Sequence, residues 1–104
     1  MLILSFLCIS DNRILSIVQR NKTCNDVGKM TIDIEEDCKE LLPFAKSYHK
    51  NVTTFKLEQE TAYEKYPSGC YIHNNKSLYF NPHKIGKRQA NSQPICKESK
   101  IINS

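Results

Sequence analysis

The chain has 104 residues, of which 39% are hydrophobic and 25% are charged. This balance is typical of one globular domain, and it excludes a disordered chain and a protein that crosses a membrane several times. Fifteen Lys and Arg against eleven Asp and Glu leave a formal net charge of +4, a mild excess that does not indicate a nucleic-acid partner.

The first ten residues are almost wholly apolar and end before Asp11. They are too few to span a bilayer, which takes about 20 apolar residues, but they suit the apolar core of a secretory signal peptide. A charged start and a clear cleavage site are missing, so a buried strand or an incomplete start of the chain is the alternative. We expect residues 1–20 to be a leader and residues 21–104 to be a single small domain. A second apolar run, residues 14–18, either extends the leader or opens the fold.

Four cysteines lie outside the leader, which holds Cys8: Cys24, Cys38, Cys70 and Cys96. An even number allows a closed set of two disulfides, each worth about 2–4 kcal/mol to a domain with a marginal core. Structural zinc favours cysteines two to four residues apart, whereas these lie at least fourteen apart. We therefore expect disulfides, and neither a metal nor a cofactor. Of the three possible connectivities we favour Cys38–Cys70 with Cys24–Cys96, and the other two stay open.

Three N-glycosylation sequons begin at Asn21, Asn51 and Asn75. About one would arise by chance in a chain with this many asparagines, and each of the three falls where a loop is expected. Glycans need exposed acceptors, so this placement suits their use. Sequons and cysteines together predict a secreted, extracellular protein.

A helix is predicted from residue 34. Asp33 and Glu36 form a capping-box pattern, and an apolar stripe follows at spacings of three and four, with Cys38 on it. Pro43 interrupts this stripe and costs about 3 kcal/mol inside a helix. We expect either a kink there, or an end near Leu42 with a second turn over residues 43–48.

The second half of the chain predicts strands. Residues 52–57 are rich in β-branched and aromatic side chains, residues 58–65 form a short helix or a loop, and residues 66–69 form a turn. Residues 70–73 and 78–81 make a hairpin, with Cys70 on one face and Tyr71 and His73 on the other. A basic loop over 83–92 leads to a short last strand over 94–97. The expected fold is α+β, with one helix packed on a small antiparallel sheet and stapled by disulfides.

Four short runs of sequence carry a resemblance to a known group. They are Ile32 with Glu36-Asp37-Cys38, then Tyr66-Pro67-Ser68-Gly69-Cys70-Tyr71, Tyr79-Phe80-Asn81 and Pro94-Ile95-Cys96-Lys97. Their order resembles small secreted cysteine-rich modules in predicted proteins of marine algae and other protists, over residues 24–97. The resemblance implies an extracellular module, and it assigns no activity and no catalytic residue.

An enzymatic function is the less favoured hypothesis. A small secreted ribonuclease needs a base, an acid and a cation near the phosphate, and His73, His83 and Lys84 offer these groups, with Glu58 or Glu60 as another base. Nothing in their spacing demands this arrangement. Phosphate-binding loops, nucleophile elbows and zinc-protease motifs do not occur in the sequence.

Binding is better supported. Tyr71 and Tyr79 on an open hairpin face would stack on sugar rings or anchor a protein, unless they complete the core. Lys84, Lys87 and Arg88 would attract an acidic glycan or a phosphate surface, unless the loop is simply solvated.

We therefore expect a secreted, glycosylated binding module without a stable membrane span. Its expected partner is an extracellular glycan or a cell-surface protein. A small hydrolase of the ribonuclease type and a structural spacer module are the alternatives.

Overall fold

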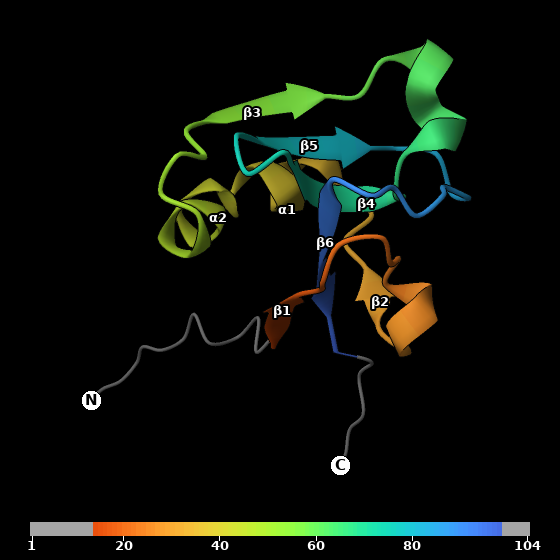
Figure 1. Cartoon of the computed structure of the whole chain (residues 1–104), viewed down its shortest axis with the longest axis horizontal. Helices are drawn as coiled ribbons and strands as arrows, with labels where there is room; N and C mark the ends of the chain where they lie inside the picture. The colour runs from red at the N-terminus through yellow and green to blue at the C-terminus, as the bar shows by residue number, and fades with distance from the viewer. Residues whose placement is uncertain (1–13, 99–104) are drawn as a thin grey trace.

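The computed structural model describes residues 14–98 (Figure 1). The leader expected over 1–20 therefore lies mostly outside the described residues, as does Cys8. Helices and strands follow one another as β1 (Leu15–Ile17), η2 (Asn25–Val27), β2 (Met30–Thr31), α1 (Glu35–Lys39), α2 (Leu42–Tyr48), β3 (Thr54–Leu57), η3 (Glu60–Lys65), β4 (Gly69–His73), β5 (Ser77–Asn81) and β6 (Ser92–Lys97), where η marks 3₁₀ helices.

The expected α+β fold is confirmed, with one difference at the edge of the sheet. The strand order is β1-β6-β4-β5-β3, and β2 also pairs with β6. All pairs are antiparallel except β3 with β5, which run in parallel. The chain leaves β3 through η3 and comes back along β4, so β5 runs in the direction of β3. The prediction of an all-antiparallel sheet is therefore wrong for the pair of β3 and β5.

The apolar run at residues 14–18 opens the fold. Leu15 and Ile17 pair with Lys97 and Ile95 of β6, and both pack against the core. The sheet thus includes residues before 21, and the predicted boundary between leader and domain stays a prediction.

The predicted helix is split in two by Pro43. α1 ends at Lys39, and α2 begins at Leu42 with the proline in its first turn. Backbone N–H groups in the first turn have no acceptor within the helix, so the N–H that proline lacks costs no hydrogen bond there. This is the second of the two predicted outcomes. The predicted cap is wrong, because Ile34 is the N-cap residue of α1 and makes no side-chain capping bond.

The predicted hairpin is confirmed as β4 and β5, with Cys70 opposite Phe80 and Ile72 opposite Leu78. Its turn contains Asn74 and Asn75 at φ 55° and 58°, a left-handed conformation that asparagine tolerates better than most residues. The last strand, β6, is also confirmed. The main core lies between α1 and the sheet, and its buried members are Ile32, Cys38, Leu41, Ala45, Val52, Cys70, Ile72, Leu78, Phe80 and Ile95.

Both disulfides have the favoured connectivity. Cys38–Cys70 joins α1 to β4 inside the core, with a Cα–Cα distance of 5.4 Å. Cys24–Cys96 joins the start of η2 to β6, at 5.6 Å. Within residues 14–98, no helix is both long enough and apolar enough to cross a bilayer.

Candidate functional site

The hairpin tyrosines lie side by side, but they do not form an open face. Tyr71 has no exposed surface and stacks between Tyr66 and Tyr79, with ring centroids 5.8 and 5.5 Å away. Its hydroxyl donates a hydrogen bond to the carboxylate of Glu58. Burial raises the pKa of Tyr71 far above its usual value, and Glu58 adds to this effect. Tyr71 is therefore part of the interior, and the prediction that it contacts a ligand is wrong. Tyr79 is half-buried.

His73 packs against the tyrosines and contacts Ser92. Its Nδ1 lies 3.0 Å from Ser92 Oγ, and its ring stands nearly perpendicular to those of Tyr66 and Tyr79. Burial lowers the pKa of His73, and the charge of Glu58 opposes this only in part. These contacts favour a neutral histidine packed among aromatic rings.

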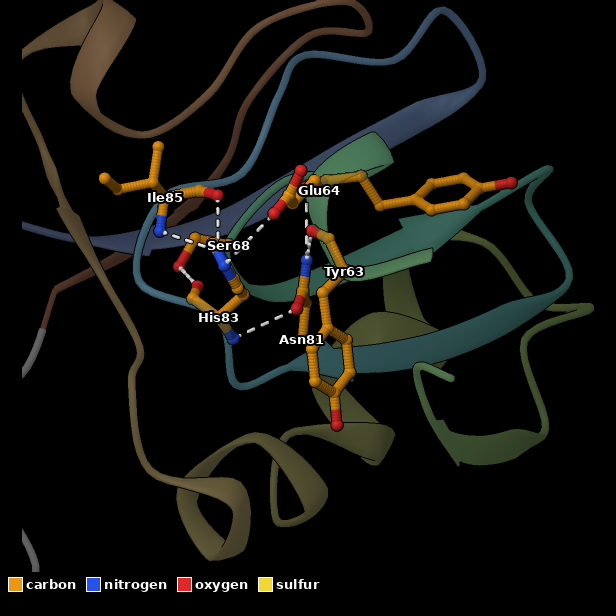
Figure 2. Close-up of polar contacts among 7 residues, drawn as sticks. Tyr63, Glu64, Ser68, Asn81, His83 and Ile85 are labelled. Carbon is orange, nitrogen blue, oxygen red and sulfur yellow. Dashed lines mark hydrogen bonds and ion pairs between the residues drawn. The ribbon is translucent and has the colours of Figure 1, made fainter. Parts of the chain in front are cut away.

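His83 fixes the loop between β5 and β6 (Figure 2). Its backbone N–H donates to Asn81 Oδ1 at 3.0 Å, and its Nδ1 lies 2.6 Å from the carbonyl oxygen of Ile85. Its Nε2 is 4.0 Å from the exposed carboxylate of Glu64. Within the described part of the chain, no hydrogen bond or ion pair joins His83 to His73, or Lys84 to either histidine. His73 thus lies among the tyrosines of β4 and β5, whereas His83 and Lys84 are neighbours in the loop after β5.

The buried side chain of Asn81, at the end of β5, anchors this loop. The residue is 1% exposed, and its Nδ2 lies 2.8 Å from the carbonyl oxygen of Tyr63, 3.2 Å from that of Tyr66 and 3.1 Å from that of Pro67. With the bond from His83 to its Oδ1, one amide ties η3 and the residues that follow it to the start of the loop after β5 (Figure 2). A buried amide with this many partners holds a unique local arrangement.

Gly86 presses the same loop against residues 66–68. A Cβ at this position would lie 2.3 Å from the carbonyl oxygen of Tyr66 and 2.4 Å from the amide nitrogen of Ser68. Only glycine permits so close an approach of two backbones. The next amide, of Lys87, donates to the Tyr66 oxygen at 3.0 Å, and Ser68 Oγ donates to the carbonyl oxygen of His83. Contacts to the backbone of the loop, from both backbone and side-chain groups, therefore fix its position.

The anchored loop forms one wall of a hollow of about 780 Å³, hereafter the basic hollow. The other walls come from η2, β2 and the end of β6. Its lining residues are Thr23, Asn25, Asp26, Lys29, Met30, Thr31, Asp33, Ser68, Lys84, Ile85, Gly86, Lys87, Arg88 and Lys97. Five of these side chains are cationic and two are acidic, so the hollow concentrates positive charge in a chain with a net charge of only +4.

Two of the five cations have carboxylate partners. Arg88 lies 2.9 Å from Asp26, and Lys29 pairs with Glu98. A hydrogen bond from the backbone N–H of Thr23 lowers the pKa of Asp26, and Arg88 lowers it further. Asp26 is therefore charged at neutral pH and holds the Arg88 guanidinium against η2.

The other three cations are Lys84, Lys87 and Lys97, and no carboxylate of residues 14–98 lies within ion-pair distance of them. Apolar side chains stand beside them, since Ile85 is 76% exposed and Met30 is 43% exposed. Three lysines without a carboxylate partner among residues 14–98 thus line the hollow together with exposed apolar side chains. Such an arrangement suits an anionic ligand that also carries C–H faces.

Only one wall of this hollow was predicted from the sequence. Lys84, Lys87 and Arg88 were predicted as binding residues, and the structure gathers all three there. Lys29 and Lys97 were missed. They meet because β2 pairs with β6, with Met30 opposite Lys97, and a two-residue strand leaves no periodic signal in the sequence.

Among the described residues, no cluster of three or more His, Cys, Asp or Glu side chains is arranged to hold a metal ion. Comparison of the chain with known protein families, with characterised proteins and with solved structures finds no match.

Proposed function

We propose that this protein is a secreted, glycosylated binding module that holds an acidic glycan in the basic hollow. The observation that carries the proposal is the set of three lysines, Lys84, Lys87 and Lys97, that line one hollow without a carboxylate partner among the described residues. Sulfate or carboxylate groups on a sugar chain would supply the missing negative charges.

The rigidity of the loop supports binding. Asn81 and Gly86 fix the backbone that carries Lys84 and Lys87, so a ligand does not have to order this segment when it binds. Ile85 and Met30 add apolar contact area for the C–H faces of sugar rings. Charge provides attraction and the apolar wall provides shape, which together distinguish an acidic sugar from a simple anion.

Secretion is supported by the two disulfides, because such bridges persist in oxidising compartments and are rare in the cytosol. Two of the three sequon asparagines, Asn21 and Asn51, are exposed, and Asn75 is half-buried. All three lie in turns. The resemblance to secreted cysteine-rich modules points to the same compartment.

The test is a titration of the protein, secreted from a eukaryotic host, with heparin as the acidic polysaccharide and dextran as the neutral one. Lys84→Ala/Lys87→Ala is compared with Lys39→Ala/Lys46→Ala, which removes the same charge from exposed positions on the helices. At about 0.7 kcal/mol for each lysine, the first variant loses about tenfold in affinity for heparin and the second stays near the wild type.

Three results would overturn the proposal. Equal losses in the two double variants would mean that net charge alone governs binding. Dextran binding as tight as heparin binding would remove the role of the lysines. Single-stranded DNA bound as tightly as heparin at the same salt concentration would show unselective attraction to polyanions.

A further inference from the structure

Two glycosylation sequons meet at the end of the sheet that is remote from the basic hollow. The loop after α2 carries Asn51, and the turn between β4 and β5 carries Asn75. Figure 1 shows both at the left end of the molecule, with the loop between β5 and β6 at the right end. Asn51 and Asn75 line a second hollow of about 420 Å³, together with residues 47–50. We call it the sequon hollow.

The two acceptor side chains are suitably placed for modification. Asn51 is exposed. Asn75 is half-buried, and its Oδ1 accepts a hydrogen bond from Arg20 at 2.6 Å. A glycan is attached through Nδ2, so this contact with Oδ1 persists after modification. Both side chains therefore border the sequon hollow in a way that is compatible with attached sugars.

An exposed tyrosine lines the same hollow. Tyr48 ends α2, three residues before Asn51, and is 55% exposed. Its ring stands perpendicular to that of His49, at 4.7 Å between centroids, and His49 Nε2 lies 2.8 Å from Gln93 Oε1. The neighbour that contacts the tyrosine ring is thus itself held by the sheet. A supported, exposed tyrosine offers a large rigid surface at little conformational cost.

We propose that the sequon hollow is the seat of the N-linked glycan of Asn51, whose first sugars pack on the ring of Tyr48. This inference rests on the secretion assumed in the proposed function, but not on the ligand of the basic hollow. In the attachment step, Asn51 Nδ2 bonds to C1 of an oligosaccharide carried on a lipid diphosphate. The bond from C1 to the phosphate oxygen breaks, the diphosphate leaves with the electron pair, and Nδ2 loses one proton.

Packing of the glycan on Tyr48 predicts that the sugar stabilises the fold. The protein is secreted from a eukaryotic host, and its melting temperature is measured before and after enzymatic removal of the glycans. The wild type is expected to lose about 4 °C on deglycosylation, the shift that roughly one aromatic contact produces in a domain of this size. Tyr48→Phe keeps this difference, whereas Tyr48→Ala abolishes it.

Two acceptor variants locate the effect. Asn51→Gln removes the dependence on Tyr48, and Asn75→Gln retains it. Ile85→Ala, which changes an exposed apolar residue at the basic hollow, leaves the glycan-dependent shift unchanged.

Peptide mapping that finds Asn51 unmodified in the secreted protein would overturn the inference, and so would a glycan-dependent shift of the same size in Tyr48→Ala. Retention of each sample on immobilised heparin reports on the proposed function separately. A protein that binds heparin but lacks sugar at Asn51 would refute this inference alone, and one that carries the stabilising glycan but ignores heparin would refute only the proposed ligand.

Discussion

Replacement of Gly86 by alanine tests whether the basic hollow depends on the close approach of two backbones. The added Cβ would lie 2.3 Å from the Tyr66 oxygen, 2.4 Å from the Ser68 nitrogen and 2.8 Å from the Pro67 carbonyl carbon. All three are backbone atoms, so no side chain can rotate away to relieve the overlap. Either the loop moves outward or residues 66–68 shift.

The size of the effect follows from what this shift breaks. Forcing an extra carbon into a tightly packed site costs about 1–3 kcal/mol. Moving the loop also breaks the bond from the Lys87 amide to the Tyr66 oxygen, worth about 1 kcal/mol. We expect Gly86→Ala to lower the free energy of unfolding by about 2–4 kcal/mol and to weaken heparin binding, because Lys84 and Lys87 move with the loop.

The assay is urea unfolding followed by circular dichroism, since the chain has no tryptophan. Gly28→Ala is the matched control. Gly28 has φ +73° and no atom within 4 Å of an added Cβ, so this variant bears only the left-handed strain of about 1–2 kcal/mol. A Gly86→Ala protein that is more stable than Gly28→Ala and binds heparin like the wild type would refute the reasoning.

Three further changes test other parts of the structure. Cys24→Ala/Cys96→Ala opens a loop of 72 residues and should cost about 4 kcal/mol in urea unfolding; a loss under about 2 kcal/mol would contradict the chain-entropy argument. Asn81→Asp keeps the shape but turns a donor into an acceptor facing three carbonyl oxygens, so a loss of at least about 3 kcal/mol at pH 7 is expected, and unchanged stability would exclude the anchor. Burial lowers the pKa of His73 below the 6.5 of an unperturbed histidine, so its contribution is complete above pH 6.5 and is lost as the pH falls toward the lowered pKa. The urea midpoint should therefore fall less between pH 7.5 and pH 5 in His73→Gln than in the wild type.

Local patterns were sufficient for the hairpin and for the break in the helix. The β4–β5 pair follows from two short apolar runs around a polar turn, and each run fixes the faces of its own side chains. Pro43 determines where α2 can begin, since its effect depends only on its own ring and missing N–H. The disulfide between Cys38 and Cys70 has the favoured pairing, but the apolar faces of these two residues did not exclude the other connectivities.

The burial of Tyr71 shows what alternation leaves undetermined. The alternation of side chains along β4 places Tyr71 and Cys70 on different faces of the sheet. It does not say whether another segment covers the face that carries Tyr71. Here the chain between β3 and β4 brings Glu58 and Tyr66 against the tyrosine. A segment predicted as a short helix or a loop carries no sign of the face on which it will pack, so an expected ligand contact became a core residue.

The basic hollow depends on both long-range and local contacts. The Cys24–Cys96 disulfide ties the start of η2 to β6 beside Lys97, and so joins two walls covalently. The wall that carries Lys84 is a loop, which hydrogen bonds, the close packing of Gly86 and the ion pair between Arg88 and Asp26 hold in place. Removing the disulfide and moving the loop should therefore impair heparin binding by separate routes. Their energetic costs should be close to additive, provided that the loop keeps its anchor at Asn81 when the disulfide is absent.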